Sequence, residues 1–150
     1  MASMGNLDTN AYCLTHMDLA PRNILVDTSS SVTTYVFTGI LEWDSAIIAP
    51  FFMSCSPPMW LWAWNDDDDE DERLAAHEPS TADMREVKRI FEGTAGSIYS
   101  KYAYQNCFTL ARKLFGFGIH GFQPNENFHS AEEMLAGWAV EQAVFMDGKS

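Results

Sequence analysis

The stretch HMDLAPRNILVD, His16–Asp27, decides how the first part of this chain folds. The apolar run Tyr12–Thr15 precedes its polar loop and the run Asn23–Val26 closes it, which predicts a strand, a loop and a second strand. Residues 28–34 are rich in Ser and Thr, as a hairpin loop is. The β-branched and aromatic run Val36–Leu41 therefore predicts a third strand that returns antiparallel to the second.

The loop carries the spacing His-x-Asp-Leu-x-x-x-Asn, which is typical of the catalytic loop of kinase-type phosphotransferases. Phosphoryl transfer needs a carboxylate that orients the attacking hydroxyl and accepts its proton, and Asp18 suits that role. It also needs an oxygen ligand for magnesium, which the Asn23 amide supplies. We expect His16 to support the loop through hydrogen bonds to the backbone, and Leu19 to anchor it in the core. The alternative is that Asp18 and Asn23 only form a turn between two strands.

A second motif, FTGILEWDSA, covers residues 37–46. It places Glu42 at the end of the predicted strand Val36–Leu41 and Asp44 two residues further on. In a kinase-like lobe this strand end holds an acidic ligand that joins magnesium to the nucleotide phosphates. Glu42 is therefore the expected acidic ligand. Asp44 is a candidate to replace it if the strand continues, because alternate residues of a strand point to the same side.

Together the two motifs resemble the aminoglycoside phosphotransferase-like family, whose pattern is roughly HxDLxxxNILVD followed by GhIDWxxA with Asp or Glu after the Trp. The match runs from Tyr12 to about Pro50. The segment PPMWLW, residues 57–62, is also similar to family members of unassigned substrate. The helical remainder fits the helical C-lobe of that family but carries no motif of its own.

The resemblance implies that Asp18 is the catalytic base, supported by His16, and that Asn23 and Glu42 hold the metal and its nucleotide. It implies Mg²⁺ and ATP as cofactors and the hydroxyl of a small molecule as the phosphate acceptor. Members act on aminoglycosides, choline, homoserine or sugars, so the resemblance does not name the substrate and does not imply antibiotic resistance.

Two features depart from the family pattern. Glu42 stands where the family has Asp, and its extra methylene moves the carboxylate by roughly a bond length, although magnesium demands near-ideal geometry. The catalytic loop also begins close to Met1, before a nucleotide-covering N-lobe with its strand-borne lysine fits. We therefore expect residues 1–150 to be a single partial domain, the catalytic-loop and C-lobe portion, that is inactive when isolated. The alternative is an inactive pseudoenzyme or remnant with a binding role or none.

The rest of the chain predicts helices, so the expected fold class is α+β: a protein-kinase-like C-lobe with a small antiparallel β element followed by a mainly helical region. Residues Ile47–Trp64 predict a short helix and an apolar loop. Ser80 and Asp83 resemble a capping box that starts the first long helix. Within the helical region we expect a break near Gly93–Gly96 and an end at Gly116. Ser130 with Glu133 predicts the start of the last helix.

The chain of 150 residues has a formal net charge of −12, which disfavours nucleic acids and anionic membrane surfaces as partners. Seven acidic residues form one run, Asp66–Glu72, which predicts a solvated loop over about residues 65–73. The cysteines Cys13, Cys55 and Cys107 are odd in number and have no CxxC spacing, which favours a reducing compartment, the cytoplasm. The sequence does not indicate an oligomeric state.

Overall fold

The structure is a computed structural model that describes residues 11–27, 35–63, 72–121 and 124–147. Side chains are described for residues 11–27, 35–63, 72–119, 121 and 128–143. The described part is α+β, with small antiparallel strand pairs first and a mainly helical region after them. The coarse fold class predicted from the sequence is therefore confirmed.

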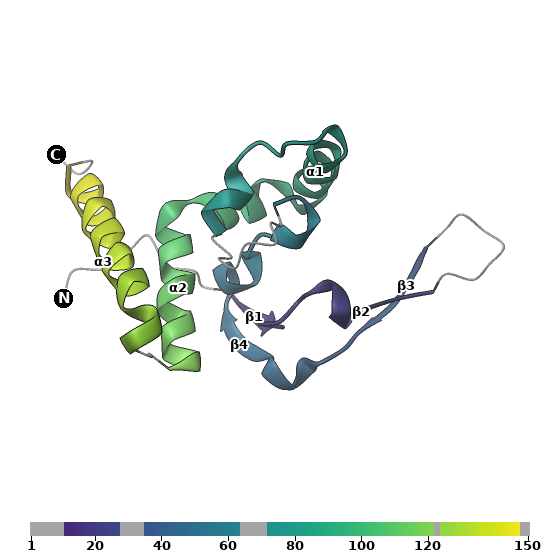
Figure 1. Ribbon diagram of the computed structural model, residues 1–150, viewed down its shortest axis with the longest axis horizontal. Helices are drawn as coiled ribbons and strands as arrows, with labels where there is room; N and C mark the ends of the chain where they lie inside the picture. The colour runs from purple at the N-terminus through teal and green to yellow at the C-terminus, as the bar shows by residue number, and fades with distance from the viewer. Residues whose placement is uncertain (1–10, 28–34, 64–71, 122–123, 148–150) are drawn as a thin grey trace.

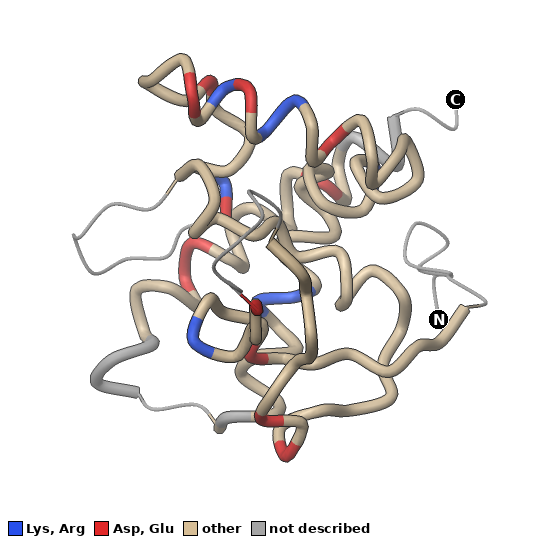
Figure 2. Tube along the Cα trace, turned by 90° about the vertical axis from the view of Figure 1, so that its right-hand side faces the viewer, with Lys and Arg blue, Asp and Glu red and all other residues tan. Residues whose placement is uncertain are grey.

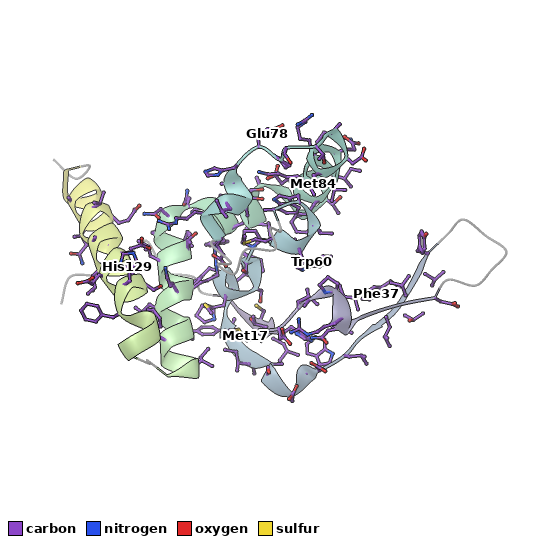
Figure 3. The ribbon with its side chains drawn as sticks, in the orientation of Figure 1. Met17, Phe37, Trp60, Glu78, Met84 and His129 are labelled. Carbon is purple, nitrogen blue, oxygen red and sulfur yellow. The ribbon has the colours of Figure 1, made fainter. Side chains whose placement is uncertain are left out.

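The strands form two separate antiparallel pairs. Strand β1, Tyr12–Thr15, pairs with β4, Ile47–Pro50, and strand β2, Ile24–Asp27, pairs with β3, Val36–Ile40. In Figure 1 the β2–β3 pair extends as an arm from the rest of the molecule, and Phe37 lies on this arm away from the helices in Figure 3. The hairpin expected from the sequence is present, although its connecting residues 28–34 lie outside the described residues.

The segment that follows the hairpin differs from the prediction. Its first residues form β4 rather than a short helix, because the β-branched Ile47 and Ile48 find a partner strand in β1. Pro50 ends the strand, and 3-10 turns follow over Phe51–Cys55 (η3) and Met59–Leu61 (η4). A further 3-10 turn, η5, spans Glu72–Ala76.

The first long helix, α1, spans Ala82–Tyr104. Its N-cap is Thr81, whose Oγ1 accepts a hydrogen bond from the Met84 amide, so the capping box predicted at Ser80 is wrong by one residue. The predicted break is confirmed at Gly96, whose φ of 83° lies in the region that favours glycine.

Helices α2, Asn106–His120, and α3, Pro124–Asp147, differ from the prediction at their ends. Helix α2 continues through Gly116 and ends at His120, with Gly121 as its C-cap at a φ of 82°. Helix α3 begins at Pro124, so the start predicted at Ser130 is wrong. Proline is well suited to a first helical position, since its missing N–H would be unpaired there.

The two helices lie side by side in Figure 1. Gly137 permits a close approach between them, because an added Cβ there would lie 3.2 Å from Leu110 Cδ2. Among the described residues, no helix is both long and apolar enough to cross a bilayer.

The hydrophobic core lies where η3, α2 and β4 meet. Phe52 and Phe108 pack ring to ring with their centroids 5.6 Å apart, and Ala49, Met53 and Ala111 complete the buried cluster. Figure 2 shows that most of the Lys and Arg residues lie along the helical trace, and the four strands carry a single charge, Asp27. The strand region is thus both weakly charged and weakly buried.

Arg112 is a buried ion-pair partner in the helical region that the sequence did not indicate. Its Nε donates to both carboxylate oxygens of Glu72, at 3.1 and 2.9 Å, and its two Nη atoms donate to the carbonyls of Phe52, Tyr102 and Ala103. Glu72 was predicted to belong to a solvated acidic loop, and for that residue the prediction is wrong. The preceding acidic residues 66–71 lie outside the described residues.

Candidate functional site

The polar loop between β1 and β2 is held from one side by His16. The His16 side chain is buried, its Nδ1 accepts a hydrogen bond from the Asp18 amide at 3.3 Å, and its Nε2 lies 2.7 Å from the Leu41 carbonyl oxygen. Since Nδ1 accepts, the proton is on Nε2, which donates to that carbonyl. Trp43 packs edge-on against the imidazole with ring centroids 4.8 Å apart. His16 therefore ties the first motif to the residue that precedes Glu42.

Asn23 holds the other end of the loop. Its side chain is 1% exposed, and its Nδ2 donates to the Asp18 carbonyl oxygen at 2.8 Å and to Asp18 Oδ2 at 3.1 Å. The Asn23 carbonyl oxygen accepts from the Leu41 amide at 2.8 Å. The contact with Oδ2 orients the Asp18 carboxylate, the contact with the carbonyl oxygen holds the loop backbone, and neither uses the Asn23 amide oxygen. Leu41 is thus bonded to both ends of the loop.

The second motif turns sharply where the site begins. Strand β3 ends at Ile40, and Glu42 adopts a left-handed backbone with a φ of 58° ahead of a 3-10 turn, η2, over Trp43–Ser45. The strand therefore does not continue to Asp44, and the condition under which Asp44 was to replace Glu42 is not met. Glu42 and Asp44 are both exposed.

Backbone strain gathers at this site. Of the described residues other than glycine, Met17 and Glu42 are the two with positive φ. Met17 comes directly before Asp18, and Glu42 comes directly after Leu41, which is hydrogen-bonded to His16 and Asn23. For residues with a Cβ this conformation costs on the order of 1–2 kcal/mol and persists only where the surrounding contacts impose it. Such strain is concentrated at functional sites, which supports a site between the two motifs.

The loop differs from the expectation at Leu19, whose side chain is 48% exposed rather than anchored in the core. Polar contacts anchor the loop instead. Besides the Asn23 contacts, the Trp60 indole donates to the Leu19 carbonyl oxygen at 3.2 Å, so the PPMWLW segment supports the loop from η4. Figure 3 shows Trp60 on the side of η4 that lies toward the strands.

Arg22 is a site residue that sequence reasoning missed. It forms an ion pair with Asp18, in which Arg22 Nη2 lies 2.5 Å from Asp18 Oδ1. The signal that could have found it is the spacing of four residues between Asp18 and Arg22, which brings opposite charges together when the intervening segment turns. The turn is the 3-10 helix η1, Pro21–Asn23.

The arrangement offers hard oxygen donors of the kind that magnesium prefers. Asn23 and Glu42 are brought to the same loop by the two Leu41 hydrogen bonds. Within the described residues, no three His, Cys, Asp or Glu side chains form a metal-holding group. Two oxygen donors, the Asn23 amide and the Glu42 carboxylate, would suit Mg²⁺, which keeps much of its coordination shell in water and phosphate oxygens.

Two of the three cysteines are poorly suited to act as nucleophiles. All three are free thiols, and Cys55 is fully buried. Burial raises the pKa of the Cys55 thiol to about 11 and also raises the pKa of Cys107, so both stay protonated near neutral pH. The loop from His16 to Asn23 is therefore the candidate site.

Comparisons of the chain with protein-family models, with curated proteins and with solved structures found no match.

Proposed function

We propose that this chain carries the catalytic loop of an ATP-dependent phosphotransferase that transfers the γ-phosphoryl group to a hydroxyl of a small molecule. The observation that carries the proposal is the pair of Leu41 hydrogen bonds, to His16 and to Asn23. These bonds join two motifs that are separate in the sequence. The resulting set of an oriented carboxylate, an amide oxygen and a second carboxylate is what phosphoryl transfer to a hydroxyl requires.

Each residue has a role in this proposal. Asp18 orients the acceptor hydroxyl and takes its proton, and the hydrogen bond from Asn23 Nδ2 to Asp18 Oδ2 holds its carboxylate in place. His16 and Trp43 keep the loop in register with the second motif. Asn23 and Glu42 hold Mg²⁺, which when bound to ATP neutralises the charge of the transferring group. The kinase-like identity of the C-lobe and a cytoplasmic location, which the free thiols favour, belong to the same proposal.

A second candidate is an inactive relative that keeps the loop only as a structural element. Glu42 in place of Asp fits a site that has lost its metal. The two candidates differ in whether a divalent ion binds between the two motifs.

The test is a map of Mn²⁺ binding by NMR, with Mn²⁺ as a paramagnetic substitute for Mg²⁺ and with ATP present. The acidic run attracts cations through its charge alone, so broadening of its own signals is not informative. Among the other amide signals, those of residues 17–24 and 41–44 should broaden at the lowest Mn²⁺ concentration. Glu42→Gln should abolish this broadening at the loop, whereas Asp44→Asn, a matched change two residues away, should preserve it. If the loop signals do not broaden in the wild-type protein, the inactive relative is the correct description.

A further inference from the structure

Arg22 is the first basic residue in the chain and the sole Lys or Arg among residues 1–72. The fold places this one cation on Asp18, with 2.5 Å between Arg22 Nη2 and Asp18 Oδ1. The surrounding site is otherwise acidic, because Glu42 and Asp44 follow on the second motif. A single positive charge that pairs with the proposed catalytic carboxylate needs an explanation beyond chance pairing.

The fold does not depend on Arg22. The Arg22 side chain is 65% exposed and that of Asp18 37% exposed, and ion pairs this accessible contribute little to stability. The loop is held instead by buried Asn23, which makes two hydrogen bonds to Asp18. Arg22 is therefore a residue whose position the loop fixes but whose removal the loop tolerates.

Among the described residues, Asp18 takes up only a small part of the donor capacity of the Arg22 guanidinium. A guanidinium has five N–H groups, and the contact with Asp18 uses one N–H of Nη2. The remaining donors are arranged as a planar fork that matches two oxygens of a phosphate group. An exposed arginine held by one edge can thus bind an oxyanion with the other.

We infer that Arg22 is the phosphate-binding cation of this site and bridges Asp18 to the oxygens of the phosphoryl group that is transferred. The inference rests on the proposed function, and it assigns the oxyanion a protein partner at a position of the first motif that the sequence analysis gave no role. With Asp18 negative, a phosphate approaching the acceptor hydroxyl would meet a like charge, and the Arg22 guanidinium offsets it. Arg22 also fixes the orientation of the phosphate through paired hydrogen bonds, which a lysine ammonium does not do.

The experiment titrates metal-free protein with inorganic phosphate and follows by NMR the backbone amide signals of Asp18 and Asn23 in every variant, together with the Arg22 Nε–H signal in the wild type. These signals should shift and saturate with phosphate. Arg22→Gln should weaken phosphate binding about tenfold or more, the loss expected for a charge-assisted hydrogen bond. The phosphate affinity of Arg22→Lys should lie between those of the wild type and Arg22→Gln, because lysine keeps the charge and loses the planar pair of donors.

The matched control is Arg89→Gln. Arg89 forms an exposed ion pair with Glu86 at 2.6 Å on α1. The substitution therefore removes the same charge from another exposed ion pair. Phosphate binding should be unchanged in this variant, and denaturant midpoints should be unchanged in all of them. Equal losses in Arg22→Gln and Arg89→Gln would show a general charge effect and overturn the inference, as would phosphate affinity in Arg22→Gln equal to that of the wild type.

The two proposals fail in separate ways. The Mn²⁺ map monitors the amides around Asn23 and Glu42, whereas the phosphate titration uses no metal and monitors Arg22. A normal Mn²⁺ map with no effect of Arg22→Gln on phosphate removes the role of Arg22 and leaves the phosphotransferase site. An absent Mn²⁺ response at the loop removes the phosphotransferase site, and a saturable Arg22 shift would then still show an oxyanion site at Asp18.

Discussion

The strand region, residues 11–50, and the helical region, residues 51–147, are held together by different interactions. Of the hydrophobic residues that are buried in the described chain, Ala49 is the one from the strand region, and the others belong to the helical region. The buried residues of the strand region are otherwise polar: Thr15, His16 and Asn23. The candidate site is therefore fixed by directional hydrogen bonds, while the helical region is stabilised by apolar packing and by the ion pair of buried Arg112 with Glu72.

This difference has a physical consequence. Apolar burial contributes stability in proportion to area, whereas a hydrogen bond contributes little net stability but specifies geometry. The strand region leaves Tyr12, Leu14, Ile48 and Phe37 more than half exposed, so it gains little from burial. The helical region should thus determine the global stability of the described fold, and the strand region should determine the geometry of the site.

The largest effect is expected at Arg112. Arg112→Met should lower the free energy of unfolding by about 3–5 kcal/mol, because it leaves Glu72 and several carbonyl groups without their donor. Arg89→Met removes an exposed pair and should cost less than about 1 kcal/mol. Urea denaturation of both variants checks the difference. Equal, small losses would mean that the Arg112–Glu72 pair does not hold the helical region together.

A smaller effect is expected at Asn23. Asn23→Ala removes two hydrogen bonds to Asp18 from a side chain that is 1% exposed and should cost about 1–3 kcal/mol. Hydrogen exchange should increase mainly at residues 16–24, because the loop and not the helical core loses its anchor. Asn106→Ala, which removes an exposed bond to Glu141, is the control and should leave exchange in the loop unchanged. Uniform acceleration across the helices would contradict the division between the two regions.

The sequence predicted the strand region better than the helical region. The motif from His16 to Asp27 specified a strand, a loop and a hairpin because alternating apolar runs and turn residues act locally. Strand β4 was missed because its partner, Tyr12–Thr15, is distant in the chain and no local pattern encodes that pairing. The Arg112–Glu72 pair was also missed, because its partners are distant in the chain. An arginine within an amphipathic helix also usually faces solvent.

Within the site, residue types were predictable and backbone geometry was not. The sequence indicated Asp18, Asn23 and Glu42 as neighbours, and the Leu41 hydrogen bonds bring their segments together. It did not indicate the left-handed backbone of Glu42 or the ion pair of Arg22, because both depend on how the chain turns after a strand ends.

The smallest effect on the free energy of unfolding is expected from changes on the exposed face of the β1–β4 pair. These changes should instead affect self-association in solution. Leu14 and Ile48 are cross-strand partners, and both are largely exposed. Apolar side chains presented in this way promote self-association. The association should strengthen with salt, because the net charge of −12 repels a second copy.

The pair Leu14→Lys and Ile48→Lys should reduce the association seen by light scattering without changing the unfolding midpoint. Ile98→Lys, on an exposed position of α1, is the control and should have a weaker effect. A monomer at high protein concentration and high salt would show that the β1–β4 face does not self-associate.

The most direct measurement on the proposed metal site is a magnesium titration of ATP binding with wild type, Glu42→Asp and Glu42→Ala. Aspartate restores the shorter ligand and adopts the left-handed backbone of this position more readily than glutamate does. Glu42→Asp should therefore lower the magnesium concentration needed for half-maximal binding. Glu42→Ala should raise it by about tenfold or more, and Asp44→Ala should leave it unchanged. If the curves for wild type and both Glu42 variants coincide, Glu42 does not bind the metal and the proposed site is wrong.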